Sequence, residues 1–340
     1  MKRIMRISTV LLLLVAIALP VFAGGSSEQT VASGPKATKI GVSKLMPHPA
    51  LDAVEQGLQD YLATTGLAVT YDLQNANGDI STSVSIAQKF KNDKVDIAVG
   101  IATPTAQALA QVFSDVPVVF SAVTDPVSAG LVDTYAGSAN TNICGVSDNN
   151  PVEEQIKLLV DLTGAKTIGN IYASGEANGV VLMEMAKEAC EKLGVNFVSA
   201  AIANSSEVKM AAQAIIDRVD AIYIATDNAV VSALPSVDEV CTKAGKPLMS
   251  ADPSGVSGLD CLVAWGFNYY SLGTATGKAI EQIINGTPSG SIGTIFLTDP
   301  ADFELWFNLD TAAKLGITIP QNLLDSAACI IKDGQQIKKN

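Results

Sequence analysis

KVDIAVGIATPTAQAL, residues 94–109, has a close counterpart in RVDAIYIATDNAVVSAL, residues 218–234. Each segment runs from a basic residue and Val-Asp through an apolar stretch to Ala-Thr, a polar pair and an Ala-rich stretch. An apolar run that leads through a polar turn into a helical pattern is typical of a strand followed by a helix. The chain therefore contains the same strand–helix unit at least twice.

The repetition extends beyond these two segments. VPVVFSAVTDPVSAGL is matched by KPLMSADPSGVSGL, and the residues that precede the two quoted stretches also align in order. Apolar runs predict strands at residues 40–42, 69–73, 97–101, 118–120, 168–172, 195–198, 221–224 and 248–249. Runs without polar alternation indicate parallel strands that helices cover on both faces. We therefore predict an α/β protein with two similar doubly wound parallel-sheet lobes.

Helix-start signals lie between several of these strands. Asn150 before Pro151 predicts a capped helix with proline at its first position. Asn204 with Glu207 three residues later predicts another helix start. The helix before residue 97 is expected to bury Val84, Ala87 and Phe90.

The N-terminal residues have the pattern of a secretory signal peptide. Lys2, Arg3 and Arg6 precede an apolar stretch at residues 10–19, and Val-Phe-Ala at 21–23 fits a cleavage site. We predict a cleavable signal at residues 1–23, a flexible leader at 24–38 and no transmembrane span in the mature chain. No Cys follows the apolar stretch, so no lipid-anchor cysteine is expected. These features predict a periplasmic or other extracytoplasmic protein.

Composition narrows the classes of partner and cofactor. Without the three basic residues of the signal, 19 Lys and Arg face 34 Asp and Glu, a net charge of −15. Such an acidic chain is not expected to bind nucleic acid. The five cysteines are expected to be small buried side chains, and Cys241 with Cys261 is the pair to test for a disulfide. With His48 as the single histidine and no ligand spacing, we expect neither a metal nor a cofactor.

Five polar loops follow predicted strands. They are residues 102–105, 121–126, 173–178, 225–228 and 250–253. Ligands of open parallel sheets bind at the carboxyl ends of the strands, where helix N-termini present free N–H groups. Helix capping alone is the alternative for each loop, but Asp125, Glu176, Asp227 and Asp252 exceed what capping requires.

The two halves differ in the chemistry of these loops. The first-half loops are rich in Thr and free N–H groups, which suit a carboxylate, whereas the second-half loops carry acids, which suit an ammonium group. We therefore expect a cleft for a small zwitterion. Asp227 is predicted to hold the ammonium, and Thr103 with Thr105 is predicted to hold the carboxylate.

Several segments together resemble one family of binding proteins. KIGVSKLMPHPALDAVEQGL, PVVFSAVTDPVSAGLV, GVSDNNPVEEQ, IGNIYASGEANGVV and WGFNYYSLG are similar to periplasmic substrate-binding proteins of an ABC-transporter family. The better-known members of that family bind tryptophan or phenylalanine. The resemblance runs from about residue 39 to the C-terminus and implies the type I periplasmic-binding fold, with lobes joined by three hinge crossovers. It also implies hinge closure on the ligand, an ABC permease and ATPase as partners, and a monomer.

The resemblance also implies lobe boundaries and ligand-binding residues. Lobe 1 is predicted at residues 39–147 plus 265–293, and lobe 2 at residues 148–264 plus 294–340. The implied ligand-binding residues are His48, Thr103, Thr105, Thr124, Asp125, Ser174, Glu176, Asn178, Asp227, Asn228 and Asp252. Many relatives carry an envelope-anchoring cysteine that this chain lacks.

Two other functions and the identity of the ligand remain open from the sequence. A cleft enzyme would use Asp227 and Asp252 for acid–base work, but no nucleophile elbow or P-loop accompanies them, so we expect no enzyme. A receptor for a membrane sensor is the second alternative. Apolar residues 45–47 and the AWGFNYY segment at 264–270 favour an aromatic side chain, although that segment also fits core packing.

Overall fold

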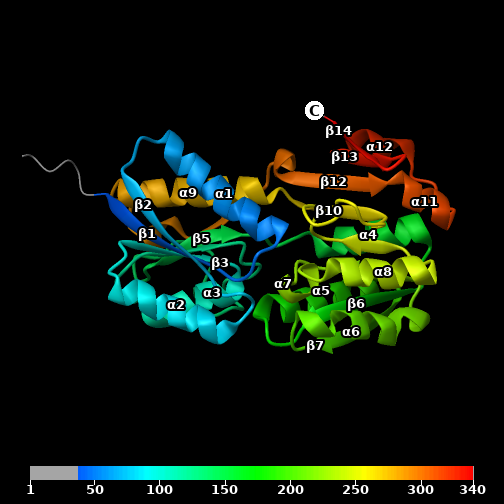
Figure 1. Ribbon diagram of the computed structural model, residues 1–340, viewed down its shortest axis with the longest axis horizontal. Helices are drawn as coiled ribbons and strands as arrows, with labels where there is room; N and C mark the ends of the chain where they lie inside the picture. The colour runs from blue at the N-terminus through cyan, green and yellow to red at the C-terminus, as the bar shows by residue number, and fades with distance from the viewer. Residues whose placement is uncertain (1–36, 340) are drawn as a thin grey trace, which may run out of the picture. The chain divides into compact units, whose positions relative to one another are not determined.

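The computed structural model describes residues 37–339 (Figure 1). The predicted signal peptide and most of the predicted leader lie outside the described residues. Across the described part, no helix has both the length and the apolar character needed to cross a membrane. The same residues hold no group of three or more His, Cys, Asp or Glu side chains placed to bind a metal ion.

The first sheet has six parallel strands in the order β11-β5-β4-β3-β1-β2. These strands are β1 (Thr38–Lys44), β2 (Val69–Asn75), β3 (Ile97–Ile101), β4 (Val118–Ser121), β5 (Ile143–Ser147) and β11 (Thr294–Phe296). Helices α1 (Pro49–Thr64) and α9 (Tyr269–Ile284) share one apolar cluster with the sheet. Helices α2 (Ile80–Asn92) and α3 (Thr103–Val112) share another, so they cover the opposite face (Figure 1). The short helix α10 (Ser289–Ile292) precedes β11.

The second sheet has eight strands in the order β14-β13-β12-β10-β9-β8-β6-β7. They are β6 (Thr167–Ala173), β7 (Asn196–Ile202), β8 (Ala221–Ile224), β9 (Leu248–Ser250), β10 (Val263–Phe267), β12 (Phe303–Asn308), β13 (Cys329–Lys332) and β14 (Gln335–Lys338). The pairs β10–β12 and β13–β14 are antiparallel and the others are parallel.

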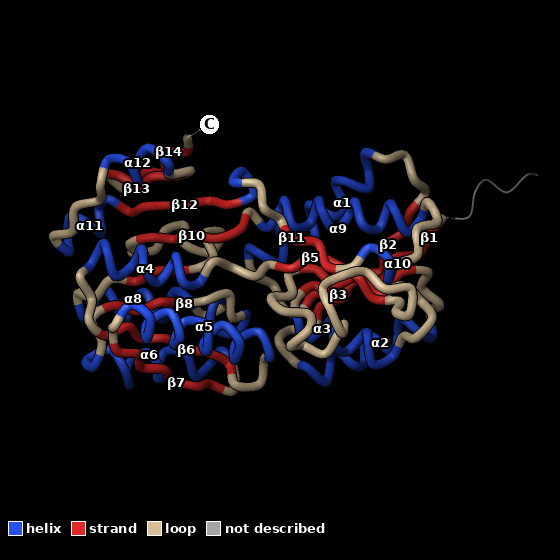
Figure 2. Tube along the Cα trace, turned by 180° about the vertical axis from the view of Figure 1, so that it is seen from behind, coloured by secondary structure: helices blue, strands red, loops and turns tan. Residues whose placement is uncertain are grey.

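Helices also cover both faces of the second sheet. Helices α4 (Val152–Thr163) and α5 (Ala177–Leu193) pack on one face with the C-terminal helices α11 (Leu309–Leu315) and α12 (Gln321–Ser326). Helices α6 (Val208–Ile215), α7 (Asn228–Val231) and α8 (Leu234–Ala244) pack on the other. Figure 2 shows the strands as a central layer with helices on either side.

The strand orders confirm the internal repeat. β2-β1-β3-β4-β5 in the first sheet corresponds to β7-β6-β8-β9-β10 in the second, strand by strand along the chain. The two segments that reveal the repeat in the sequence are β3–α3 and β8–α7. The predicted fold class of two doubly wound lobes is therefore confirmed.

The chain passes between the two sheets three times, after β5, after β10 and after β11. The predicted lobe boundaries differ from the pairing at two places. Residues 265–267 end β10 of the second sheet, and residues 294–296 form β11 of the first sheet. Both segments are the last strand before a crossover, where a sequence pattern does not show which sheet the strand joins.

Local predictions had mixed outcomes. Asn204 caps the turn Ser205–Glu207 that leads into α6, as expected, by accepting a hydrogen bond from the Ser206 amide. Asn150 does not cap α4: Pro151 is the N-cap residue, and the Asn150 amide donates to the Asp148 carbonyl instead. In α2, Val84 is exposed and Ile86 takes its place in the core. All five cysteines lie among the described residues, each buried and unpaired, as expected for small core side chains.

Helices α1 and α9 cross with their backbones in contact. A Cβ atom at Gly57 would lie 2.3 Å from the carbonyl oxygen of Tyr270, and one at Gly273 would lie 2.2 Å from that of Val54. Only glycine allows so close an approach. Because α1 begins after His48 and α9 begins at Tyr269, this crossing fixes the relative positions of those two residues.

Candidate functional site

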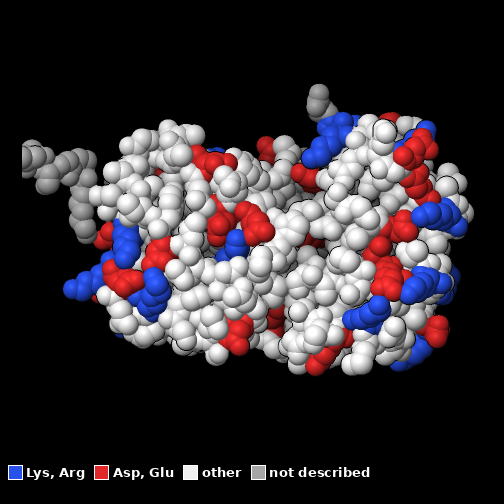
Figure 3. All heavy atoms as spheres, viewed as in Figure 1, with Lys and Arg blue, Asp and Glu red and all other residues white. Residues whose placement is uncertain are grey.

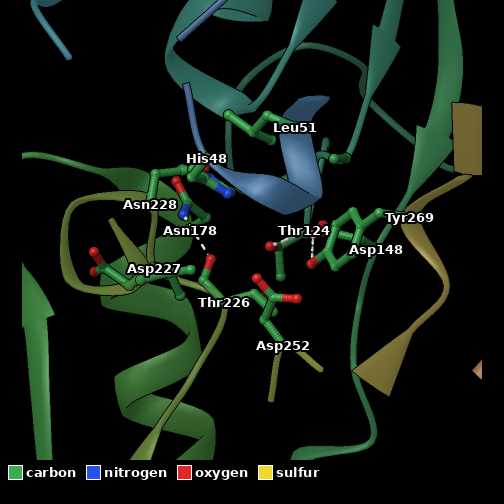
Figure 4. A pocket seen from close by; sticks show the side chains of 12 residues that line it. His48, Leu51, Thr124, Asp148, Asn178, Thr226, Asp227, Asn228, Asp252 and Tyr269 are labelled. Atoms are coloured by element: carbon green, nitrogen blue, oxygen red, sulfur yellow. Dashed lines mark hydrogen bonds between the residues drawn. The ribbon is translucent and has the colours of Figure 1, made fainter. Parts of the chain in front are cut away.

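A cavity lies where the carboxyl ends of strands from the two sheets meet (Figure 4). Its lining comes from the segments that follow β1, β4, β5, β6, β8 and β9 and from the start of α9. The lining residues are His48, Leu51, Ala122, Thr124, Asp148, Asn178, Thr226, Asp227, Asn228, Val231, Asp252 and Tyr269. Parallel sheets place ligand sites at this edge, and here the two repeats contribute to one site.

Six of the eleven residues proposed from the sequence lie in this lining: His48, Thr124, Asn178, Asp227, Asn228 and Asp252. Sequence reasoning missed Asp148, because it follows a strand that no apolar run had marked, and Thr226, which stands beside Asp227 in a loop that was identified. Tyr269 belongs to the AWGFNYY segment and is the member of it that reaches the cavity. Trp265 lies elsewhere, and Tyr270 is exposed, with its hydroxyl bonded to Asp60.

The other five proposed residues lie outside this lining. The Thr105 hydroxyl donates to the carbonyls of Ile101 and Ala102, each at 2.8 Å, so it is bound within its own turn. Thr103 is buried outside the cavity lining, and its hydroxyl has no hydrogen-bond partner among residues 37–339. Asp125 accepts hydrogen bonds from the amides of the turn that follows it and from the Tyr135 hydroxyl. For Asp125 this is the capping alternative. Neither Thr103 nor Thr105 lines this cavity.

Ser174 and Glu176 also act within the second lobe. The Ser174 hydroxyl donates to the Ile202 carbonyl at 3.2 Å. The buried Glu176 carboxylate accepts from the Asn228 side chain at 2.6 Å, the Asn178 side chain at 3.4 Å and a backbone amide. Glu176 therefore orients two asparagines that line the cavity. Burial raises the pKa of Glu176, and these hydrogen bonds only partly oppose the shift.

Asp227 lines the cavity, but its carboxylate is already occupied. One oxygen accepts from the Ala173 amide at 2.6 Å, and the other caps α7 through the Val230 amide at 3.1 Å. Figure 4 shows the carboxylate directed away from the space between His48 and Asp252. Burial raises the pKa of Asp227, and the nearby Glu176 carboxylate adds to the shift. Asp227 ties β6 to α7, which leaves it poorly placed to receive an ammonium group.

Asp252, unlike Asp227, has one carboxylate oxygen that accepts no hydrogen bond within the described chain. Its Oδ1 accepts from the Ser254 amide at 2.8 Å and the Ser254 hydroxyl at 2.6 Å. Its Oδ2 is buried and has no hydrogen-bond partner among residues 37–339. The residue is 1% exposed, and burial raises the pKa of its carboxyl group. A buried carboxylate oxygen without a donor is costly, so this atom is available to a ligand.

Asp148 lies across the cavity from the second lobe's loops. Its carboxylate accepts from the Tyr269 hydroxyl at 3.0 Å and from the Thr124 hydroxyl at 3.2 Å (Figure 4). Burial raises the pKa of Asp148 to about 6, and the two hydrogen bonds only partly oppose the shift. The neighbouring Asp252 carboxylate raises it further.

The charges of the cavity are therefore mainly negative. Asp148, Asp227 and Asp252 are lining residues, and none of the lining residues in the described chain is Lys or Arg. On the face shown in Figure 3, Lys and Arg gather mainly toward the two ends of the view, beside acidic residues. Exposed ion pairs of the chain include Lys209–Glu239 and Lys192–Glu153, and such pairs contribute little to stability. The site thus favours a cationic group on its ligand.

The cavity is narrow as it stands. Its free volume is about 10 Å³, close to the space that one water molecule needs. A second cavity of about 360 Å³ lies nearby and is lined by Leu45, Met46, Pro47 and Pro104 from the first lobe and by Glu176, Ala229 and Ser232 from the second. The two cavities adjoin, because Pro47 and Ala229 of the second are the chain neighbours of His48 and Asn228 of the first. A ligand of amino-acid size therefore requires movement of side chains or of the lobes.

Asp148 gives the free protein a specific dependence on pH. Between its ordinary pKa of 3.8 and about 6 the folded state holds a proton that the unfolded state has lost. The free energy of unfolding should therefore fall as pH rises from about 4 to about 6, by up to about 3 kcal/mol from this group, of which about 1.4 kcal/mol is lost above pH 5. Urea unfolding at pH 5 and pH 7.5 should show a smaller fall in Asp148→Asn than in the wild type. Equal falls in the two proteins would contradict this assignment.

The fold and this cavity define a two-lobed binding protein of the type I periplasmic-binding class. The chain belongs to the ABC transporter substrate binding protein family, whose pattern matches residues 39–331. Members of this family bind small-molecule ligands outside the cytoplasm and work with a permease. The resemblance inferred from the sequence is thus confirmed at the level of the family and the fold.

Three relatives illustrate the similarity. A tyrosine-binding protein of Clostridioides difficile (strain R20291) is 34% identical over 295 residues, which cover 85% of this chain and 84% of the relative. An ABC domain from Streptococcus pneumonia in complex with L-Trp has a TM-score of 0.82 at 33% identity, covering 87% of this chain and all of the other. The ligand-free, open structure of a substrate binding protein with adhesive properties from Clostridium difficile has a TM-score of 0.66 at 34% identity, covering 87% and 99%.

Proposed function

We propose that this protein is the extracytoplasmic solute-binding receptor of an ABC importer and that it binds an aromatic amino acid between its lobes. The observation that carries the proposal is the buried, unpartnered Oδ2 of Asp252 in a cavity whose lining, within residues 37–339, includes no Lys or Arg. The names of two relatives, which refer to tyrosine and L-Trp, support an amino acid as the ligand class.

The ligand's ammonium group binds Asp252, with Asp148 as the second negative charge. Asp252 offers a free carboxylate oxygen, whereas both oxygens of Asp227 accept backbone amides. An ammonium group that reaches Asp252 replaces a missing donor and stabilises the ionised form of a carboxyl group whose pKa burial has raised. This assignment moves the ammonium site from the position that the sequence indicated.

The ligand's side chain extends into the second cavity. Its first-lobe wall includes Leu45, Met46 and Pro47, the apolar residues from which an aromatic ligand was inferred, together with Pro104 of the loop at residues 102–105. Its volume of about 360 Å³ falls in the range of ligand pockets. Burial of a flat ring against apolar side chains supplies the affinity that the polar end does not.

The function is tested by identifying what the protein binds. Native mass spectrometry of the purified protein is expected to show a co-purified small molecule with the mass of an aromatic amino acid. The protein is first unfolded and refolded to remove any co-purified ligand. In a thermal-shift panel, tyrosine, tryptophan and phenylalanine should then stabilise it more than leucine, a pentose or a purine nucleoside. Ligand at 100 times its Kd adds about 2.7 kcal/mol to the free energy of unfolding. Stabilisation by the pentose or nucleoside alone would contradict the proposal.

Asp227→Ala is expected to act first on stability. The change leaves the buried amides of Ala173 and Val230 without acceptors and removes the cap of α7, so the free energy of unfolding should fall by about 1–3 kcal/mol. Urea unfolding measures the loss. At ligand concentrations that saturate the variant, calorimetry should still detect one bound amino acid per chain. Complete loss of binding in a stably folded variant would return the ammonium site to Asp227.

A further inference from the structure

His48 is buried at the cavity without a hydrogen-bond partner. It is the N-cap residue of α1, yet its side chain caps no amide of that helix. The residue is 8% exposed, and within the described chain neither Nδ1 nor Nε2 makes a hydrogen bond by distance and angle. Figure 4 shows the ring at the cavity, close to Asn228. A buried imidazole whose nitrogens make no hydrogen bond has a donor and an acceptor that are available to a ligand.

The start of α1 offers further donors at the same place. By helix geometry the amides of Ala50 and Leu51 have no acceptor within the helix, and neither donates to another part of residues 37–339. Both residues are 1% exposed. The first N–H groups of a helix point back toward its start, the end at which His48 and Leu51 line the cavity. The dipole of this 16-residue helix also favours a negative charge there.

We propose that the ligand's α-carboxylate binds at the start of α1, where a ring N–H of His48 and the amides of Ala50 and Leu51 donate to it. The proposal rests on the proposed function and deepens it, because it gives the ligand a direction and requires a free carboxylate. The carboxylate end lies on the first lobe and the ammonium end on Asp252 of the second. It replaces the expectation that Thr103 and Thr105 hold the carboxylate.

The charges around His48 are compatible with this role. Burial lowers the pKa of His48, so that the neutral ring is favoured near neutral pH, while the Asp252 carboxylate and the Asn228 side chain oppose that shift. Asp52 and Lys44 act on the ring weakly and in opposite directions. A neutral imidazole has one N–H donor for the carboxylate and one acceptor nitrogen, and the neighbouring Asn228 amide can serve the latter.

Calorimetric titrations with matched ligands test the proposal. The probes are L-tyrosine, L-tyrosinamide and tyramine. All three keep the ring and the amine, but the carboxylate is present in L-tyrosine, replaced by a neutral amide in L-tyrosinamide and absent from tyramine. On the wild-type protein, the free acid should bind about 10- to 100-fold more tightly than either analogue. Equal affinities for the acid and the amide would overturn the proposal and leave the amino-acid receptor intact. No binding of any of the three probes, or of tryptophan and phenylalanine, would instead count against the proposed function and overturn this proposal with it.

Variants of His48 separate a direct contact from a structural role. His48→Ala should weaken the binding of L-tyrosine by about tenfold or more but change that of tyramine little, so that the ratio of the two affinities falls. His48→Gln, which keeps an N–H donor, should restore part of the ratio. An unchanged ratio in a folded His48→Ala protein would overturn the role of His48. If the variants do not fold, the three-ligand comparison on the wild type still decides the carboxylate requirement.

Discussion

Asp252→Asn is expected to weaken amino-acid binding by about 2–5 kcal/mol, or roughly 30- to 5000-fold in Kd. The change keeps the oxygen that accepts from the Ser254 amide but removes the negative charge. Within residues 37–339, Oδ2 of Asp252 is the only buried carboxylate oxygen of the cavity lining that lacks a hydrogen-bond partner. An ammonium group desolvated in the closed cleft then has no full counter-charge. Isothermal titration calorimetry at pH 7.5 measures the effect.

The same variant should be at least as stable as the wild type without ligand. Burial raises the pKa of Asp252, so ionisation of this group at neutral pH costs stability in the free protein. Loss of binding together with an unchanged or higher Tm therefore separates a binding role from a folding role. Asp125→Asn is the matched control, because Asp125 also precedes a proline in the repeated segment but lies outside the cavity. Wild-type affinity in Asp252→Asn would contradict the assignment.

Gly273→Val is expected to lower the free energy of unfolding by about 3 kcal/mol or more. A Cβ atom at this position lies 2.2 Å from the carbonyl oxygen of Val54 and 2.9 Å from the amide of Leu58, and both are backbone atoms of α1. No side-chain rotation relieves such a contact, so α1 and α9 must separate. His48 and Tyr269 start from these helices, so ligand affinity should fall in the fraction that remains folded.

Gly255→Ala provides the control for this prediction. A Cβ atom at Gly255 meets its nearest neighbour at 3.9 Å, an ordinary contact distance, so its stability should stay within about 0.5 kcal/mol of the wild type. Guanidinium unfolding of the three proteins measures both changes. A Gly273→Val protein as stable as the control would show that the two helices are not held at this distance.

The fold could be predicted from the sequence because apolar strand segments and the polar turns after them are local signals, and they occur in both halves of the chain. Strands β3 and β8 were predicted with the bounds that the structure has, since each is a buried apolar run between polar turns. The same duplicated pattern explains why five strands of each sheet have the same order. The crossover strands β10 and β11 were less clear, because the sheet that a short strand joins depends on tertiary packing.

The site could be predicted from the sequence only in part, and the two Asp-Pro loops show why. Asp125-Pro126 follows β4 and Asp252-Pro253 follows β9, so they occupy equivalent positions in the repeat. The Asp125 carboxylate is used by its own turn and by Tyr135, whereas Asp252 keeps one oxygen free in the cavity. A sequence pattern indicates that a carboxylate stands at the ligand edge of a sheet. Whether it caps its own loop or faces a ligand depends on neighbours from distant parts of the chain.

A crystal structure of the protein with its bound amino acid tests the central claim most directly. We predict the ligand's ammonium nitrogen at about 2.8 Å from Oδ2 of Asp252, with its carboxylate at the start of α1 and its ring in the cavity beside Leu45 and Pro104. A ligand whose ammonium group binds Asp227 while Asp252 stays unpartnered, or a ligand without an ammonium group in this cleft, would contradict the account.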